Sequence, residues 1–193
     1  VDADYQTYLH IFQKYRLRYG LAEWAFELLP NHVHHVGVPE EETSLAKTIR
    51  TAHSQYARYY NQKYGSTGHL WGDRFFSCPM DEAHLWHCVR YVETNAIRAG
   101  LVDKLGRYPW SSSMARLAGT VDWFIDPACR LVDDFGPWGQ YLASRLDASV
   151  VETIRECTRL GKPAGDSSFI ARIEGQLGRP CSRAPRGRPR KHA

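Results

Sequence analysis

The sequence predicts an α+β fold in which an antiparallel pair of strands is packed by helices. Residues 21–29 alternate in polarity as a half-buried strand does, a Pro-Asn turn follows, and residues 32–38 form a second strand, which together predict a hairpin. Apolar residues at helical spacing precede and follow this hairpin. A chain of 193 residues with 43% hydrophobic content can form one domain with an appendage, or two small domains.

The first strand of the hairpin, "LAEWAFELL", has the clearest pattern. Strict alternation predicts that Glu23 and Glu27 share one face, while the other face is apolar and holds Ala22, Trp24, Phe26 and Leu28. The helix before it begins at Asp2 or Asp4, either of which can act as a cap, and ends at Gly20. The helix after the hairpin opens at residues 40–43 and ends at Gly65.

The rest of the chain is predicted to be mainly helical. The Gly-rich loop "GSTGHLWGDRFFSCP" leads to a short strand near 74–78, and a helix then runs from Asp81 to Gly100. Further helices are expected at 137–146, 148–160 and 167–178, the last with a serine cap.

Charge is distributed unevenly along the chain. Six of the 25 Lys and Arg residues lie between Gly175 and Ala193, a segment without acidic residues, which leaves 19 bases against 21 acids before it. A basic terminal tail on a near-neutral body is typical of proteins that hold nucleic acid. No apolar stretch is long enough for a membrane span, so we expect a cytoplasmic, nucleoid-associated protein without a membrane partner. The five cysteines form no CxxC pair and predict reduced thiols.

The segment "PNHVHHVGVP" crowds three histidines into four positions. On a strand, His32 and His34 project from one face, and two neutral imidazoles side by side form half of a site for a divalent metal. His35 points to the opposite face, where we expect it to pack or to form hydrogen bonds. An isolated His-x-His pattern is more often a pair of ordinary surface or core histidines, so the motif alone is a weak signal.

A second signal lies in "RYVETNAIRAG", where Tyr91 and Asn95 are four residues apart and share one face of a helix. Asn95 could offer a carbonyl oxygen to a metal, while Tyr91 could present its hydroxyl to an electrophile that a metal has polarised. Without further support, Tyr91 is more often a tyrosine of the core.

Four motifs in order, "LPNHVHHVGVP", "GSTGHLWGDRFFS", "RYVETNAIRAGLV" and "YPWSSS", resemble the REP-associated tyrosine transposases of the IS200-like, single-tyrosine HUH (His-hydrophobic-His) family. The resemblance implies a ferredoxin-like HUH nuclease core. It also implies that Tyr91 is the catalytic nucleophile, and that His32, His34 and Asn95 hold a divalent metal, Mg²⁺ or Mn²⁺. The implied reaction cleaves single-stranded, hairpin-bearing DNA through a 5′-phosphotyrosine intermediate.

The resemblance also sets the expected domains. Residues 1–118 correspond to the catalytic domain, 119–178 to a helical C-terminal region, and 179–193 to a basic tail. Relatives begin with a strand reading like "YHVTSRGN", and this chain starts after that position, so we expect the catalytic domain to lack its first strand. His35 replaces an apolar residue, and "NAIRAG" stands where "NPVRAG" is usual.

Several basic and aromatic residues are candidates for contact with DNA: Arg50, Arg58, His69, Trp71, Arg74, Arg186, Arg188, Arg190 and Lys191. On the helix after the hairpin, a solvated face beside a tyrosine-rich core side explains most of the pattern equally well. The segment "PRGRP" (185–189) matches an AT-hook, which enters the minor groove of duplex DNA, and non-specific phosphate binding is the alternative.

Three functions therefore compete. The first is a metal-dependent DNA nicking and joining enzyme that uses Tyr91. The second is a catalytically inactive, truncated DNA-binding derivative of such an enzyme. The third is an unrelated hydrolase that binds zinc through His32 and His34 and does not depend on Tyr91.

Overall fold

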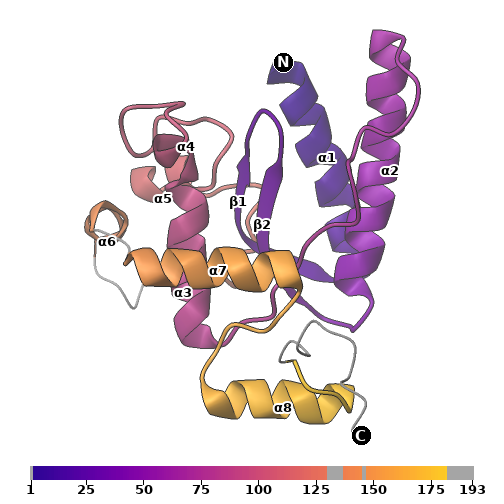
Figure 1. Cartoon of the computed structure of the whole chain (residues 1–193). Helices are drawn as coiled ribbons and strands as arrows, with labels where there is room; N and C mark the ends of the chain where they lie inside the picture. The colour runs from indigo at the N-terminus through magenta and orange to yellow at the C-terminus, as the bar shows by residue number, and fades with distance from the viewer. Residues whose placement is uncertain (1, 130–136, 145–146, 182–193) are drawn as a thin grey trace, which may run out of the picture. The chain divides into compact units, whose positions relative to one another are not determined.

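The computed structural model describes residues 2–129, 137–144 and 147–181 (Figure 1). It confirms a mixed α+β class, with a two-stranded antiparallel sheet and several helices. The chain divides into two units. The first comprises Val1–Phe75 and Trp86–Asp147, and the second comprises Phe76–Leu85 and Ala148–Ala193.

In the first unit, helices α1 (Asp2–Tyr19) and α2 (Ser44–Tyr64) pack against each other beside the hairpin of β1 (Leu21–Leu28) and β2 (Val33–Pro39) (Figure 1). Gly20 ends α1 with a φ of +65°, a conformation that costs a glycine little, and the next residue starts β1. The main core lies between α1, α2 and this hairpin; its largest members are Tyr8, Phe12, Phe26, Tyr56 and Phe124.

Asp4 fixes the start of α1 to the end of α2. Its carboxylate accepts hydrogen bonds from Tyr59 (3.0 Å), Lys63 (2.6 Å) and Tyr64 (2.6 Å). These bonds hold the pKa of Asp4 well below its usual range, with Lys63 as the main cause. Three polar side chains of α2 are therefore engaged in contacts with α1.

The hairpin differs from the predicted alternation because β1 contains a bulge. Glu23 pairs with Gly37 and Ala25 pairs with Val36, so Trp24 is an extra residue in β1. The bulge separates the two glutamates that alternation places on one face. The carboxylate of Glu23 bonds to His35, whereas Glu27 lies directly opposite His34, and neighbouring side chains of a strand point to opposite faces. Neither glutamate faces solvent, because both are 0% exposed.

The helix expected from Asp81 to Gly100 is two helices. Helix α3 (Glu82–Glu93) stops at Thr94, which has a φ of −104° and a ψ of 3°, and α4 (Asn95–Arg98) follows. Two short helices complete the first unit, α5 (Ser113–Ala118) and α6 (Trp138–Ala143). The predicted strand at 74–78 is wrong, since this segment is irregular and only Met80 forms an isolated bridge, with Ala164.

The second unit contains α7 (Ala148–Leu160) and α8 (Ser167–Leu177), close to the predicted bounds. The segment before α3 is tied to the turn between these helices, because the carbonyl of Pro79 accepts from the backbone N–H of Ala164 at 2.8 Å. The cap of α8 is Asp166 rather than a serine, and its carboxylate accepts from the N–H of Phe169 at 2.8 Å. Within the described ranges, no helix combines the length and the apolar character that a membrane span requires.

Candidate functional site

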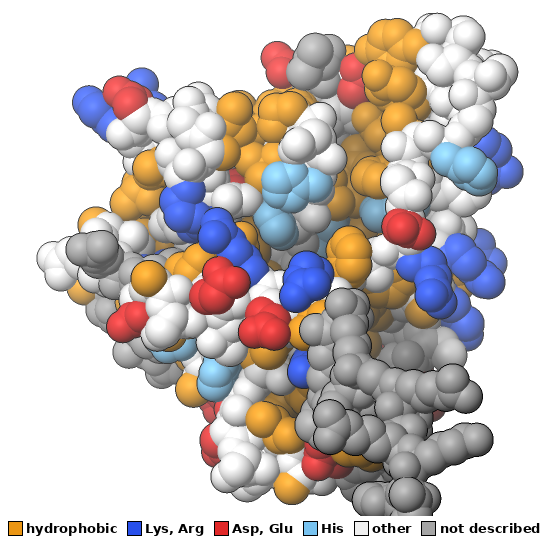
Figure 2. Space-filling model, in the orientation of Figure 1, with side chains coloured by type: hydrophobic (Ala, Val, Ile, Leu, Met, Phe, Trp, Pro, Cys, Tyr) orange, Lys and Arg blue, Asp and Glu red, His pale blue; other side chains and the backbone are white. Residues whose placement is uncertain are grey.

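The expected histidine pair is formed at the start of β2. The rings of His32 and His34 lie 4.9 Å apart at nearly right angles; His32 is exposed and His34 is half-buried. Histidine side chains gather at the surface over the hairpin (Figure 2). His32 directly precedes β2 and His34 is its second residue, and the short ring separation places the two imidazoles side by side, as the sequence predicts.

Loss of contact with water favours the neutral form of both imidazoles. It lowers the pKa of His32, and it lowers the pKa of His34 to about 4, with smaller contributions from the charges of its neighbours. Nδ1 of His32 lies 2.6 Å from the side-chain oxygen of Asn31. If Nδ1 donates this bond, Nε2 carries the lone pair. Nε2 of His34 is buried without a hydrogen-bond partner. A neutral imidazole nitrogen of this kind can donate its lone pair to a metal.

Tyr91 of α3 reaches the same place from a distant part of the sequence. Its ring centroid is 5.9 Å from that of His34, at an angle of 81°, and the side chain is 9% exposed. Asn95, which the sequence places on the same helix as Tyr91, is instead the first residue of α4 beyond the break at Thr94, and it is also 9% exposed. The structure thus brings together the nucleophile and the histidine that the resemblance implies.

Arg98 was not among the residues predicted for the site. Its guanidinium carbon lies 4.2 Å from the centre of the Tyr91 ring, in a cation–π contact. The same guanidinium donates to the side-chain oxygen of Asn95 at 2.8 Å. The amide oxygen expected as a metal ligand therefore already accepts a bond from a cation.

Glu27 is a second residue that the sequence did not assign to the site. It pairs directly with His34 across the hairpin, so the two side chains share a face. Burial raises the pKa of Glu27 to about 8, although the backbone N–H of Ala96 and the hydroxyl of Ser111 oppose this rise. Neither carboxyl oxygen has a hydrogen-bond partner in good geometry. The site thus holds a desolvated carboxyl group beside the histidine pair.

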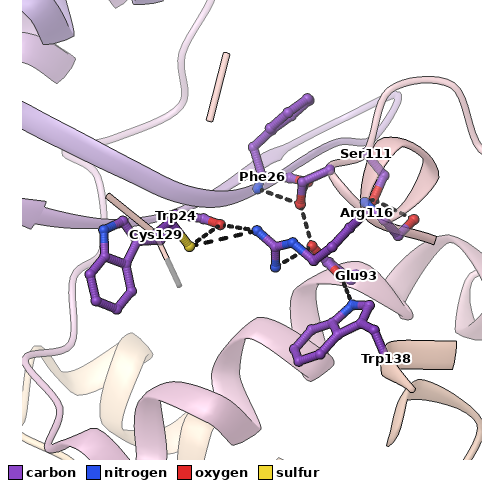
Figure 3. Close-up of polar contacts among 9 residues, drawn as sticks. Trp24, Phe26, Glu93, Ser111, Arg116, Cys129 and Trp138 are labelled. Carbon is purple, nitrogen blue, oxygen red and sulfur yellow. Dashed lines mark hydrogen bonds and ion pairs between the residues drawn. The ribbon is translucent and has the colours of Figure 1, made fainter. Parts of the chain in front are cut away.

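A buried polar network fixes α3, the helix that carries Tyr91, to the sheet (Figure 3). Glu93, two residues after Tyr91, forms an ion pair with Arg116 at 2.9 Å and accepts from Ser112 (2.6 Å) and Trp138 (2.8 Å). Ser112 in turn bonds to the backbone of Phe26 in β1. This network holds α3 against the hairpin and so sets where Tyr91 lies.

The bulge in β1 contributes to this network. Arg116 donates to the carbonyl of Trp24, the extra residue of the bulge. A bulged residue is left out of the ladder of strand hydrogen bonds, so its carbonyl is available to another donor. Ser111, Ser112 and Ser113 of "YPWSSS" are all buried beside β1, which gives this motif a structural role.

The opposite face of the hairpin carries His35, and the prediction that it packs and forms hydrogen bonds is confirmed. Nδ1 of His35 lies 2.8 Å from the carboxylate of Glu23, and Nε2 lies 2.9 Å from the hydroxyl of Tyr8. The hydroxyl of Tyr8 also lies 3.1 Å from Nε2 of His53. The His35 ring stacks on Phe12 at 3.9 Å between centroids. These contacts leave no position for a ligand at His35.

The donor set at the site fits a divalent metal in part. Two neutral imidazoles lie on one face, and one of them has a buried nitrogen without a hydrogen-bond partner. No group of three or more His, Cys, Asp or Glu side chains that could hold a metal occurs in the part of the chain that the structure describes. A metal held here would need an amide oxygen, such as that of Asn95, or groups supplied by water and phosphate.

The candidate DNA-binding residues lie on other elements. Arg50 and Arg58 are exposed on α2, and His69 and Arg74 are exposed in the loop that follows it. Trp71 is half-buried and is held to α2, because it stacks on His53 at 3.9 Å and donates to the His53 carbonyl at 3.0 Å. The remaining four candidates lie outside the described residues: Arg186, Arg188, Arg190 and Lys191.

The N-terminal part of the chain is similar to a known protein family. Residues 1–95 match the family model described as "Transposase IS200 like". The match covers β1, β2, the histidine pair, Tyr91 and Asn95, and it supports the IS200-like family for this part of the chain. The family suggests DNA transposition, which makes a transposase the class of enzyme that the match supports. Searches among curated proteins and among solved structures found no match.

Proposed function

We propose that this chain is a REP-associated type of transposase that nicks and rejoins single-stranded, hairpin-bearing DNA. The proposed nucleophile is Tyr91, and the proposed metal ligands are His32, His34 and Asn95. The proposed fold of the N-terminal part is the ferredoxin-like HUH nuclease core, of which the described hairpin is a portion.

The chemistry is a phosphoryl transfer without a nucleotide cofactor. The phenol oxygen of Tyr91 attacks the scissile phosphorus, and the bond from phosphorus to the 3′ oxygen breaks. The phenol loses its proton, the leaving oxygen gains one, and the downstream strand stays joined to Tyr91 as a 5′-phosphotyrosine ester. Attack by a 3′-hydroxyl on this ester reverses the step and rejoins the DNA.

A bound Mg²⁺ or Mn²⁺ would supply Lewis-acid polarisation of the scissile phosphate. His32 and His34 would hold it through imidazoles whose neutral form is favoured by loss of contact with water. Asn95 can contribute its amide oxygen only while Arg98 also donates to that atom, or after Arg98 has moved.

The observation that carries the proposal is the contact between His34 and Tyr91. The two rings come from elements more than 50 residues apart in the sequence, yet their centroids lie 5.9 Å apart beside a buried, unpartnered imidazole nitrogen. Buried polar groups without a partner are rare in native proteins and call for an explanation, and binding of a ligand is one. A nucleophile beside such a group is the arrangement that phosphoryl transfer requires.

The experiment that tests the proposal is incubation with Mn²⁺ and a labelled single-stranded hairpin oligonucleotide, followed by denaturing electrophoresis. Wild type should give a covalent adduct. Tyr91→Phe should give none, because it removes only the attacking oxygen, and should bind the oligonucleotide with unchanged affinity. DNA binding without an adduct in wild type would favour the inactive derivative. Tight zinc binding together with indifference to Tyr91→Phe would favour the unrelated hydrolase.

We also propose that the basic tail contacts duplex DNA. Deletion of residues 183–193 removes five Lys and Arg side chains and should weaken binding to duplex DNA. It should also lower the slope of log affinity against log salt concentration by up to about four to five, because each phosphate contact contributes nearly one to that slope. An unaltered slope would show that the tail does not contact DNA.

A further inference from the structure

We infer that Arg98 is a catalytic residue of the proposed reaction, and that its guanidinium binds the non-bridging oxygens of the scissile phosphate while Tyr91 attacks. The inference rests on the proposed function, since it assigns a role at the same site. It adds a cation that comes from the protein itself, beside any metal held by the histidine pair.

Arg98 lies directly on the nucleophile. Its guanidinium carbon is 4.2 Å from the centre of the Tyr91 ring, and one of its terminal nitrogens donates to the Tyr91 carbonyl at 2.8 Å. Tyr91 is 9% exposed, whereas Arg98 is exposed. A phosphate that approaches the phenol oxygen from solvent therefore passes a positive charge at the surface of the site.

The guanidinium is held in a defined orientation. It donates to the hydroxyl of Thr94 at 2.6 Å and to the side-chain oxygen of Asn95 at 2.8 Å, in addition to the carbonyl of Tyr91. All three acceptors lie at the break between α3 and α4, within seven residues of Arg98. Preorganised charge lowers a reaction barrier more than mobile charge does, because no reorganisation is needed when the transition state forms.

Arg98 also shares its surroundings with the histidine pair. Its positive charge is one of the causes that lower the pKa of His34, and it opposes the rise in the pKa of Glu27. The charge therefore acts both on the imidazole proposed to hold a metal and on the carboxyl group of Glu27. One site thus contains the proposed nucleophile, a proposed metal ligand and a fixed cation.

The chemistry of phosphate favours arginine at this position. Negative charge is spread over the equatorial oxygens in the transition state of phosphoryl transfer, and the planar fork of a guanidinium matches two of them at once. Arginine residues in this role accelerate phosphoryl transfer by about 10³ to 10⁵. A structural role is the competing explanation, because Arg98 also bonds to the carbonyl of Tyr91 at the end of α3.

The test measures single-turnover cleavage of the labelled hairpin DNA, after the position that wild type cuts has been mapped. Arg98→Ala should slow cleavage by about 10³, with an affinity for DNA that changes by less than about threefold. Arg98→Lys should recover less than about tenfold of that loss, because an ammonium group lacks the planar fork. Arg107→Ala, which removes an exposed arginine of the same unit, is the matched control and should cleave at the wild-type rate.

A second substrate separates catalysis from structure. A methylphosphonate at the scissile position replaces one charged oxygen with a methyl group, and each stereoisomer is measured separately. With that charge removed, Arg98 is no longer required, so the rate ratio of wild type to Arg98→Ala should fall from about 10³ to below about ten.

The outcomes distinguish failure of the role of Arg98 from failure of the nicking function. An adduct in wild type with an unchanged rate in Arg98→Ala overturns the role of Arg98 and leaves the nicking function standing. An equal rate loss on phosphodiester and methylphosphonate shows that Arg98 only caps α3, and also overturns the role. No adduct in wild type rejects the nicking function and the role of Arg98 with it.

Discussion

The two faces of the hairpin each place a histidine of β2 near a glutamate of β1, yet the two pairs differ in their hydrogen bonds. On the α1 face, His35 bonds to Oε1 of Glu23 through one nitrogen and to Tyr8 through the other, and only Oε2 of Glu23 is left without a hydrogen-bond partner. On the α3 face, His34 lies opposite Glu27, and neither Nε2 of His34 nor the carboxyl oxygens of Glu27 have a partner in good geometry.

The difference separates a structural pair from a candidate functional pair. Hydrogen bonds between buried partners make a core rigid and specific, whereas a buried polar group without a partner costs about 1–3 kcal/mol. Such a group calls for an explanation, and use by a ligand is one. The pair without hydrogen-bond partners, His34 and Glu27, is the one beside Tyr91 and Arg98, which is where the proposed reaction takes place.

The largest effect that this comparison predicts is on activity. His34→Ala should reduce formation of the adduct by about 10³ or more, because it removes a proposed metal ligand, and should leave the free energy of unfolding within about 1 kcal/mol of wild type. The measurements are the cleavage assay and urea denaturation. His35→Ala is the matched control and should show the reverse pattern, with a large loss of stability. Equal activity in the His34 variant would refute the metal site.

On the α1 face of the hairpin, Glu23→Ala should lower the free energy of unfolding by about 3 kcal/mol. The substitution leaves His35 buried without its carboxylate, and breaking a buried pair on one side is strongly destabilising. Glu23→Gln keeps the shape and one acceptor, so it should lose less, about 1 kcal/mol. Denaturation in urea at pH 7 measures both variants. A loss below 0.5 kcal/mol in the alanine variant, on the scale of a surface substitution, would show that the pair contributes little.

On the α3 face of the hairpin, Glu27→Gln should make the protein more stable at alkaline pH. The pKa of Glu27 is raised to about 8 in the folded chain, above its ordinary value of 4.5, so the folded chain holds its proton longer than the unfolded chain does. The contribution of Glu27 is therefore present at low pH and is lost as the pH rises through 8.

The difference in unfolding free energy between Glu27→Gln and wild type should grow between pH 5 and pH 9 by about 2–4 kcal/mol. Urea denaturation in a chelating buffer measures it without interference from metal. A difference that is constant with pH would mean that Glu27 titrates normally.

Much of the fold can be predicted from the sequence because its signals are local. The hairpin and the helices at both ends of the chain follow from polarity, turn residues and caps, and β1 ends within one residue of the predicted position. The shared face of His32 and His34 follows from strand geometry alone. The four-residue spacing of Tyr91 and Asn95 predicts one continuous helix, whereas the structure places them in α3 and α4.

The bulge at Trp24 could not be predicted, because the polarity alternates in the same way on both sides of it. The bulge sends Glu23 and Glu27 to opposite faces, where Glu23 meets His35 and Glu27 meets His34. The approach of Arg98 to Tyr91 was also out of reach, since it depends on the break at Thr94. Thr94 follows a helical pattern in sequence, and only the packing of α3 and α4 decides where the helix stops.

The smallest predicted effect concerns the edge of the hydrogen-bond network around His35 on the α1 face. Tyr8→Phe removes one hydroxyl and keeps the ring, so it should lower the free energy of unfolding by about 1 kcal/mol. The hydroxyl lies within hydrogen-bonding distance of His35 (2.9 Å) and His53 (3.1 Å), and both imidazoles lose a partner in the variant. Activity should stay at the wild-type level, because these side chains lie on the face away from Tyr91. A loss of adduct at unchanged stability would show instead that the two faces of the hairpin are coupled through β2.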